Sequence, residues 1–198
     1  MARALFVVDV QNDFTEGGAL GVTGGAAVAA GISRHLAAHA GLYELVVASR
    51  DWHDAEGDNG GHFAQDAEPD YVDTWPVHCV AGTPGADYHP DLDVDRIDVH
   101  VRKGQGAPAY SAFEGTTDDG RTLAEVLDER GITDVDLVGI ATDYCVRASG
   151  LDALGSGRRA RVLVDLVAGV APASSEAALK ELADAGAELV DEAGEVTR

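Results

Sequence analysis

Five residues whose side chains can do chemistry lie within a few positions of apolar runs in the sequence: Asp9, Asp51, His53, Lys103 and Cys145. Apolar runs of this length predict buried β-strands. The carboxyl ends of parallel strands meet at one edge of an open α/β sheet, which is where such sheets bind their ligands. The sequence therefore predicts that two carboxylates, an imidazole, an amine and a thiol converge at one site.

Cys145, in the segment GIATDYCVRAS, is the candidate nucleophile. We expect it in the first turn of a helix, where the N-terminal field and a nearby ammonium favour the thiolate. Lys103 is the candidate ammonium, because only two of the 14 basic residues are lysines and such a bias suggests a need for a compact amine. Cys79, in WPVHCVAG, has no such neighbours and is interpreted as a buried structural thiol.

Asp9 closes the apolar segment FVVD and is the candidate for proton transfer. A carboxylate in a partly desolvated cleft has a raised pKa, which suits it to exchange protons with a substrate or a nucleophile. The competing interpretation is an ordinary aspartate at a strand end that caps the following turn.

Asp51 and His53 indicate a metal site. They stand two residues apart, so in an extended chain both side chains project to the same side and can share one cation. His62, after the segment GDNGG, and His78, in TWPVHC, complete a set of oxygen and nitrogen ligands that suits Zn²⁺, Fe²⁺ or Mn²⁺. The glycines around His62 fix no geometry for it. The remaining histidines are interpreted as structural or surface residues: His35, His39, His89 and His100.

The apolar runs alternate with helical patterns along the chain. The predicted strands span residues 4–8, 44–48, 97–102, 135–140, 161–166 and 187–190. The predicted helices span residues 25–40, 121–130, 143–156 and 174–185. Ser174 is the expected N-cap of the last helix. This alternation predicts an α/β fold with a mostly parallel sheet covered by helices on both faces, and we expect residues 1–198 to form one domain.

The composition limits the partners. A net charge of −21, from 14 basic and 35 acidic residues, argues against nucleic acid, anionic membranes and large anionic substrates. No stretch approaches the ~20 apolar residues that span a bilayer, and the opening MARALFVVDV reaches Asp9 too soon for a signal peptide. We therefore expect a cytoplasmic protein that acts on a small molecule. The oligomeric state is open, a homo-oligomer included.

Several segments in order carry a family resemblance. FVVDVQNDF, SRDWH, TWPVHCVAGTPGADYHP, RKGQGAPAYSAFEG and GIATDYCVRAS together resemble the nicotinamidases and pyrazinamidases within the isochorismatase-like cysteine hydrolases. The resemblance covers most of the chain, and the ordered set of motifs is far more specific than any one of them. It implies a Rossmann-like three-layer α/β/α fold with a six-stranded, mostly parallel sheet.

The resemblance also implies roles for individual residues. It implies a catalytic triad of Asp9, Lys103 and Cys145, and one divalent transition metal, with Zn²⁺ favoured over Fe²⁺ and Mn²⁺. It implies a cis peptide bond between Ile140 and Ala141. The residues that it implies as metal ligands are Asp51, His53, His62 and His78, and those that contact the substrate ring are Phe14, Trp75 and Tyr110.

The implied reaction is the hydrolysis of nicotinamide to nicotinate and ammonia, as in NAD salvage, and hydrolysis of the pyrazine analogue is left open by the sequence. An amide is a poor electrophile, so the reaction needs an activated nucleophile, an oxyanion site and an acid. The Cys145 thiolate would attack the carboxamide carbon to form a thioester, Asp9 would transfer protons, and Lys103 would stabilise the thiolate. The backbone N–H groups of Ala141 and Cys145 would hold the oxyanion.

Three other functions remain open from the sequence. A cysteine amidohydrolase acting on a carbamoyl or ureido compound would not need the metal ligands. Isochorismate hydrolysis proceeds without a cysteine nucleophile and is disfavoured. A non-catalytic module that binds a metal or a small molecule is possible on the same fold, because fold does not determine function. The intact triad at three strand ends argues against that module.

Overall fold

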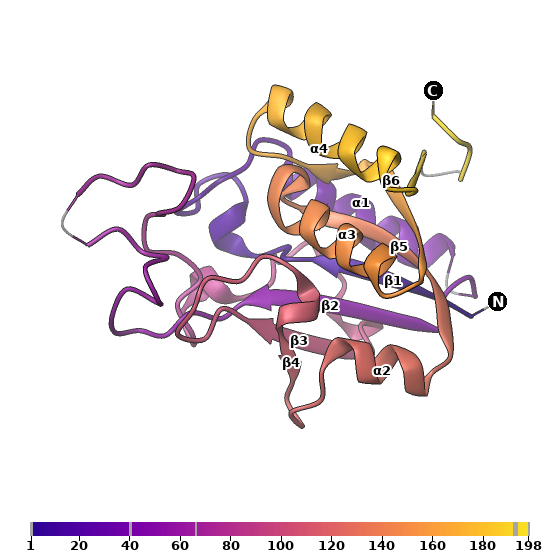
Figure 1. Cartoon of the computed structure of the whole chain (residues 1–198), viewed down its shortest axis with the longest axis horizontal. Helices are drawn as coiled ribbons and strands as arrows, with labels where there is room; N and C mark the ends of the chain where they lie inside the picture. Colours follow the sequence, from indigo (N-terminus) through magenta and orange to yellow (C-terminus); the bar gives the residue numbers. More distant parts are fainter. Residues whose placement is uncertain (1, 40, 66, 192–193, 198) are drawn as a thin grey trace.

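One seven-stranded sheet organises the computed structural model, which describes all residues except 1, 40, 66, 192–193 and 198 (Figure 1). The strand order is β4-β3-β2-β1-β5-β6-β7. All neighbouring strands are parallel except β3 and β4, which are antiparallel. The strands are β1 (Ala2–Val8), β2 (Leu45–Asp51), β3 (Val99–Lys103), β4 (Thr116–Thr117), β5 (Ile132–Ile140), β6 (Arg159–Ala168) and β7 (Glu188–Val190).

Helices cover both faces of this sheet. They are α1 (Gly25–Ala38), α2 (Leu123–Glu129), α3 (Arg147–Gly155) and α4 (Pro172–Asp184). The apolar side chains of α1 pack on one face, and those of α2, α3 and α4 pack on the other. Within the described ranges, no helix is long and apolar enough to cross a bilayer.

Strand β1 shows why the sheet is buried on both sides. Leu5 and Val7 point to the α1 face, whereas Ala4, Phe6 and Val8 point to the opposite face, and all five are at most 1% exposed. Burying a large apolar side chain contributes roughly 1.5–3 kcal/mol, so a strand that is apolar on both faces is stable only between two helical layers.

The predicted fold class is confirmed. All six predicted strands are present, with ends shifted by a few residues, and four helices lie at the predicted places. The sheet has one strand more than the six expected, because β4 is only two residues long and has no readable pattern. The single-domain expectation stays a prediction.

The helix that we predicted over residues 174–185 begins earlier than expected. Ala171 is the N-cap of α4, so the assignment of Ser174 as the N-cap was wrong. The carboxylate of Asp143 caps this helix from outside, since it accepts hydrogen bonds from the N–H groups of Val170 and Ala171 at 3.0 and 3.2 Å. Asp143 lies two residues before Cys145, so the same interaction fixes the segment that carries the candidate nucleophile.

At the carboxyl end of β5, Gly139 packs too closely on β1 to be replaced by a residue with a side chain. Gly139 has φ +116°, and a Cβ at this position would lie 2.1 Å from the carbonyl oxygen of Val8. Val8 is the last residue of β1, so the contact sets how Asp9 leaves the sheet. The peptide bond between Ile140 and Ala141 is cis, as the family resemblance predicted.

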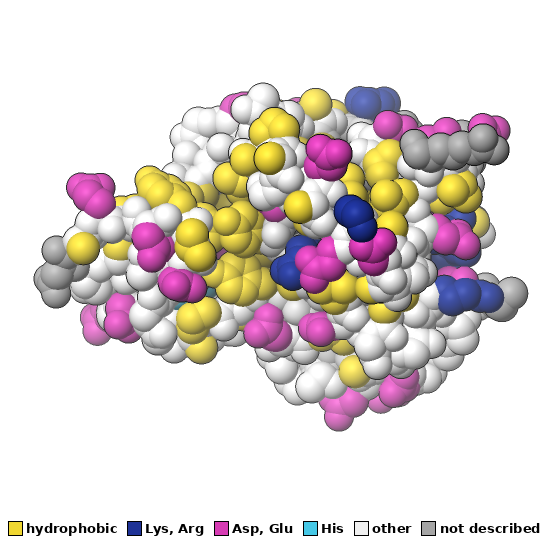
Figure 2. Space-filling view, turned by 45° about the horizontal axis from the view of Figure 1, so that its top comes forward, with side chains coloured by type: hydrophobic (Ala, Val, Ile, Leu, Met, Phe, Trp, Pro, Cys, Tyr) yellow, Lys and Arg dark blue, Asp and Glu magenta, His cyan; other side chains and the backbone are white. Residues whose placement is uncertain are grey.

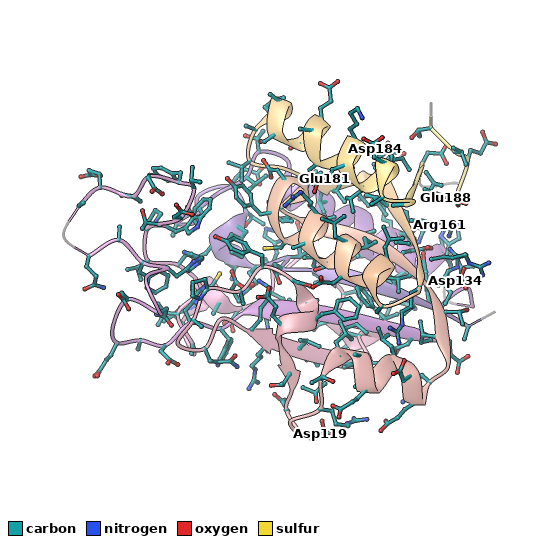
Figure 3. The ribbon with its side chains drawn as sticks, viewed as in Figure 1. Asp119, Asp134, Arg161, Glu181, Asp184 and Glu188 are labelled. Atoms are coloured by element: carbon teal, nitrogen blue, oxygen red, sulfur yellow. The ribbon has the colours of Figure 1, made fainter. Side chains whose placement is uncertain are left out.

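Charged residues close the opposite end of the sheet, at the start of β5 and β6. Asp136 is fully buried; it accepts two hydrogen bonds from Arg161, at 2.8 and 2.6 Å, and a further one from Arg3. Tyr43 also donates its hydroxyl to this carboxylate, at 3.1 Å. Figure 3 shows Arg161 and the neighbouring Asp134 at this end, away from the loops that project beyond the other.

We predict that Asp136→Ala destabilises the fold by about 3 kcal/mol, because it leaves a partly buried guanidinium without its carboxylate. Urea unfolding measures the change. Asp184→Ala is the matched control, because it also removes a carboxylate from an ion pair, the exposed one with Lys180. We expect the control to behave as an ordinary surface substitution. Equal stability of the two variants would contradict the prediction.

Candidate active site

A cavity of about 280 Å³ opens at the carboxyl ends of the strands. Loops that follow β2 project beyond these ends (Figure 1). The cavity is lined by Cys145 and by three of the four candidate metal ligands, Asp51, His62 and His78. Most of the remaining wall is apolar. Figure 2 shows hydrophobic side chains gathered beside the projecting loops.

Lys103 is the centre of the polar groups beneath this cavity. Its side chain is fully buried. Its ammonium lies 2.9 Å from Asp9 Oδ2, donates to Asp51 Oδ1 and to the carbonyl oxygen of Ala109, and lies 3.7 Å from the sulfur of Cys145. Burial alone would lower the pKa of Lys103, but the carboxylates of Asp51 and Asp9 outweigh it and hold this pKa well above its usual value. These two carboxylates therefore favour the charged form of Lys103.

Asp9 directly follows β1 in a left-handed conformation, with φ +47°. The hydroxyl of Ser49, on the neighbouring strand β2, donates to Asp9 Oδ1 at 2.7 Å and leaves Oδ2 to face Lys103. Burial raises the pKa of Asp9, and Lys103 and the Ser49 hydrogen bond partly oppose this effect. A raised pKa is what a carboxylate needs to accept and return a proton.

Cys145 lies in a π-helical turn, Thr142–Val146, that leads into α3. We had expected it in the first turn of an α-helix. Burial raises the pKa of the Cys145 thiol well above its usual value, Lys103 opposes that shift, and Asp9 and Asp51 add to it. The thiolate that we expected is thus not favoured by these protein groups alone.

The predicted oxyanion site is placed beside this sulfur. Ala141 and Cys145 both line the cavity, and the turn is closed by hydrogen bonds from the N–H groups of Tyr144 and Val146 to the carbonyl oxygen of Ala141. The role of the Ala141 and Cys145 N–H groups stays a prediction.

His53, His62 and His78 converge on one point. Each offers a ring nitrogen within 4.8 Å of the others, and all three side chains are buried. Asp51 Oδ2 lies 3.7 Å from Nε2 of both His53 and His78. The Nδ1 atoms of these two rings are hydrogen-bonded to the carbonyl oxygens of Gly104 and Pro76, so their Nε2 atoms face the common point.

The donor set fits a divalent transition metal. Nε2 of His53 and Nδ1 of His62 are buried and have no hydrogen-bond partner among the described residues, which is costly unless another group satisfies them. Burial, together with His53 and His78, lowers the pKa of His62 to about 4. Three imidazoles and a carboxylate form a usual ligand set for such ions.

The loop that carries His62 is more ordered than its glycines suggest. Asn59 is buried and has φ +49°. Its side-chain oxygen accepts from the N–H groups of Asp54 and Gly106, at 2.8 and 3.2 Å, and its amide donates to the carbonyl oxygen of Asp54. Sequence reasoning missed this role, although an asparagine before a Gly-Gly pair is a recognisable turn residue.

The aromatic residues predicted to contact a ring line the cavity: Phe14, Trp75 and Tyr110. Trp75 donates its indole N–H to the Tyr110 hydroxyl at 3.0 Å, and the Phe14 ring lies 5.5 Å from that of His78. Tyr144 was missed. Its ring meets Trp75 edge-on and stacks on Tyr110, and its position next to Cys145 was the available signal.

Gln11 is a second missed residue. It is fully buried, and its side-chain amide accepts from the N–H of Asp51 at 2.8 Å and donates to the Asp51 carbonyl oxygen at 2.9 Å. These two hydrogen bonds pair with the backbone N–H and carbonyl of Asp51, as a neighbouring β-strand would, and so fix its position. A glutamine two residues after Asp9, within an apolar segment, was the available signal.

The residues that we interpreted as structural lie outside the cavity lining. Cys79 is fully buried, and its carbonyl oxygen accepts from the N–H of His53 at 3.0 Å, so it supports the metal ligand without facing it. Four histidines on α1, on β3 and in loops also lie outside the cavity lining: His35, His39, His89 and His100.

Comparison with known proteins agrees with this geometry. The isochorismatase domain matches residues 3–194. The chain belongs to the isochorismatase-domain family. Within that family it is 53% identical to the nicotinamidase/pyrazinamidase of Mycobacterium tuberculosis over 188 residues. The alignment covers 95% of this chain and 98% of the relative. It is 36% identical to the nicotinamidase of Escherichia coli, over 94% of this chain and 93% of the relative.

Solved structures of the family share the fold. PnC1 from L. infantum in complex with nicotinate has a TM-score of 0.82 at 34% identity, covering 100% of this chain and 96% of that chain. The pyrazinamidase of Pyrococcus horikoshii in complex with zinc has a TM-score of 0.82 at 38% identity, covering 96% of this chain and 99% of that chain.

We predict that Gly104→Ala weakens metal binding by about 10–100-fold, because a Cβ would lie 2.6 Å from the His53 ring and displace it. Gly120→Ala is the matched control. Gly104 and Gly120 have φ values of +82° and +83°, so both variants carry similar backbone strain, but nothing lies within 4 Å of a Cβ at Gly120. Titration of each metal-stripped variant with Zn²⁺ against a chromophoric chelator measures the affinity. Unchanged affinity in Gly104→Ala would contradict this prediction.

Proposed function

We propose that this protein is an amidohydrolase that converts nicotinamide to nicotinate and ammonia through a thioester on Cys145, as in NAD salvage. The observation that carries the proposal is the contact of one buried ammonium, that of Lys103, with Asp9 and with the Cys145 sulfur at the base of the cavity. The nicotinamidase relatives support the choice of substrate. The M. tuberculosis relative, named for pyrazinamidase activity as well, supports pyrazinamide as a second substrate.

The proposed reaction assigns a role to each of Asp9, Cys145 and Ala141 in the positions that the structure gives them. Asp9 accepts the thiol proton as the Cys145 sulfur bonds to the carboxamide carbon. The N–H groups of Ala141 and Cys145 bind the oxyanion, and one good donor of this kind contributes roughly 3–4 kcal/mol to the transition state. Asp9 then returns the proton to the leaving nitrogen, and the C–N bond breaks to release ammonia. Asp9 next removes a proton from water as the water oxygen bonds to the thioester carbon. The C–S bond then breaks, Asp9 returns the proton to the sulfur, and the acid product ionises to nicotinate.

The aromatic residues that line the cavity would form the ring-binding part of the site. Phe14, Trp75 and Tyr110 would hold the pyridine ring by their faces and edges. Asp51 and the three imidazoles would hold the metal, and zinc is our first choice because a related pyrazinamidase structure contains it. A bound Zn²⁺ would supply a Lewis acid for the pyridine nitrogen, directly or through water, and so orient the ring. Fe²⁺ and Mn²⁺ fit the same donors.

We predict that Cys145→Ala lowers ammonia release from nicotinamide by roughly 10³-fold or more, because the covalent step is lost. Ammonia is measured with a coupled glutamate dehydrogenase assay under saturating nicotinamide. Cys79→Ala, which removes the other buried thiol, is the control and should keep near-normal turnover. Turnover by Cys145→Ala at the rate of the unmodified protein would reject the thioester mechanism.

A further inference from the structure

Asp51 belongs to two groups of residues at once. Its Oδ1 accepts from the ammonium of Lys103, and its Oδ2 faces Nε2 of His53 and His78 at 3.7 Å. The same ammonium reaches the Cys145 sulfur. We propose that Asp51 makes the reactivity of Cys145 depend on occupancy of the histidine site: a bound divalent cation draws the Asp51 carboxylate and leaves Lys103 to stabilise the thiolate.

Counting charges gives the direction of this effect. Without a metal, the buried groups near the sulfur are two carboxylates, Asp9 and Asp51, and one ammonium, Lys103, with a sum of −1. Losing the thiol proton to solvent places a third anionic centre beside that single ammonium. A divalent cation on Asp51 changes the sum from −1 to +1. The thiolate is then attracted by the site as a whole.

Burial makes the effect large. Asp9 and Lys103 are 0% exposed and Asp51 is 3% exposed, so little water screens their charges. Charge interactions are several times stronger in such surroundings than in water. Burial and both carboxylates also raise the pKa of the Cys145 thiol, while Lys103 opposes them, so the sulfur responds to each of these charges. A shift of one pKa unit changes the thiolate fraction about tenfold.

The contacts separate this role of Asp51 from that of an ordinary ligand. His53 and His78 would contribute nitrogen donors, and their other ring nitrogens are hydrogen-bonded to the carbonyl oxygens of Gly104 and Pro76. Asp51 alone among the candidate ligands bonds to Lys103 in the described part of the chain. Replacing Asp51 should therefore change the reactivity of the sulfur in the metal-free protein, whereas replacing His53 should not.

The test is the rate at which iodoacetamide alkylates Cys145 near neutral pH, with peptide mass spectrometry to separate it from Cys79. The unmodified protein is compared after treatment with a chelator and after reloading with Zn²⁺. We expect reloading to accelerate alkylation of Cys145 by about tenfold or more. An equal or slower rate in the zinc-loaded protein would overturn the proposal.

Two variants sharpen the test. Asp51→Asn keeps an acceptor for Lys103 but removes the charge, so its Cys145 should alkylate faster than in the chelated unmodified protein, with or without Zn²⁺. His53→Ala removes a ligand without changing the charge, so it should stay slow in both conditions. Thermal unfolding identifies a variant that does not fold, and the comparison on the unmodified protein stands without it. A folded Asp51→Asn protein as slow as His53→Ala would contradict the proposal.

The inference rests on the metal site and the nucleophile of the proposed function, but not on the identity of the amide. Alkylation needs no substrate. Absence of ammonia release from nicotinamide, with zinc-dependent alkylation intact, would reject the proposed substrate and leave the coupling in place. Normal ammonia release with zinc-independent alkylation would reject the coupling alone.

Discussion

The buried ammonium of Lys103 holds the candidate active site together. It pairs with two carboxylates that would repel each other strongly away from water, and it lies beside the only sulfur that lines the described cavity. Taking three ionised groups out of water costs several kcal/mol for each, and only close pairing offsets this cost. The site therefore depends on Lys103, because its removal would leave two buried carboxylates without a cation.

The sheet provides the rigidity that this arrangement needs. Asp9, Asp51 and Lys103 stand at the ends of three adjacent parallel strands, so the backbone hydrogen bonds of the sheet fix their spacing. Cys145 comes from the neighbouring strand β5 through a turn whose Asp143 caps α4. The candidate triad thus lies at the edge of a sheet buried on both faces, while the segment after β2 supplies His62 and Trp75.

Much of this could be predicted from the sequence. Apolar runs that end in Asp9, Asp51 and Lys103 place these residues at one sheet edge without any knowledge of their contacts, because parallel strands end together. What could not be predicted depends on contacts between distant segments. The hydrogen bond from Ser49 to Asp9, the amide pair of Gln11 and the order that Asn59 gives its loop follow no local period. The two contacts of the Asp51 carboxylate could not be predicted either. Only the fold shows that Oδ1 accepts from Lys103 and that Oδ2 faces His53 and His78.

The charge of Lys103 is the most direct quantity to measure, because both the proton transfers of Asp9 and the link to the metal ligands require a cation at this position. Neutron diffraction from a deuterated crystal shows each proton on Lys103 and on Asp51. We predict three deuterons on the Lys103 nitrogen and none on the Asp51 carboxylate. A neutral amine at Lys103, with the deuteron on Asp51, would contradict the central claim.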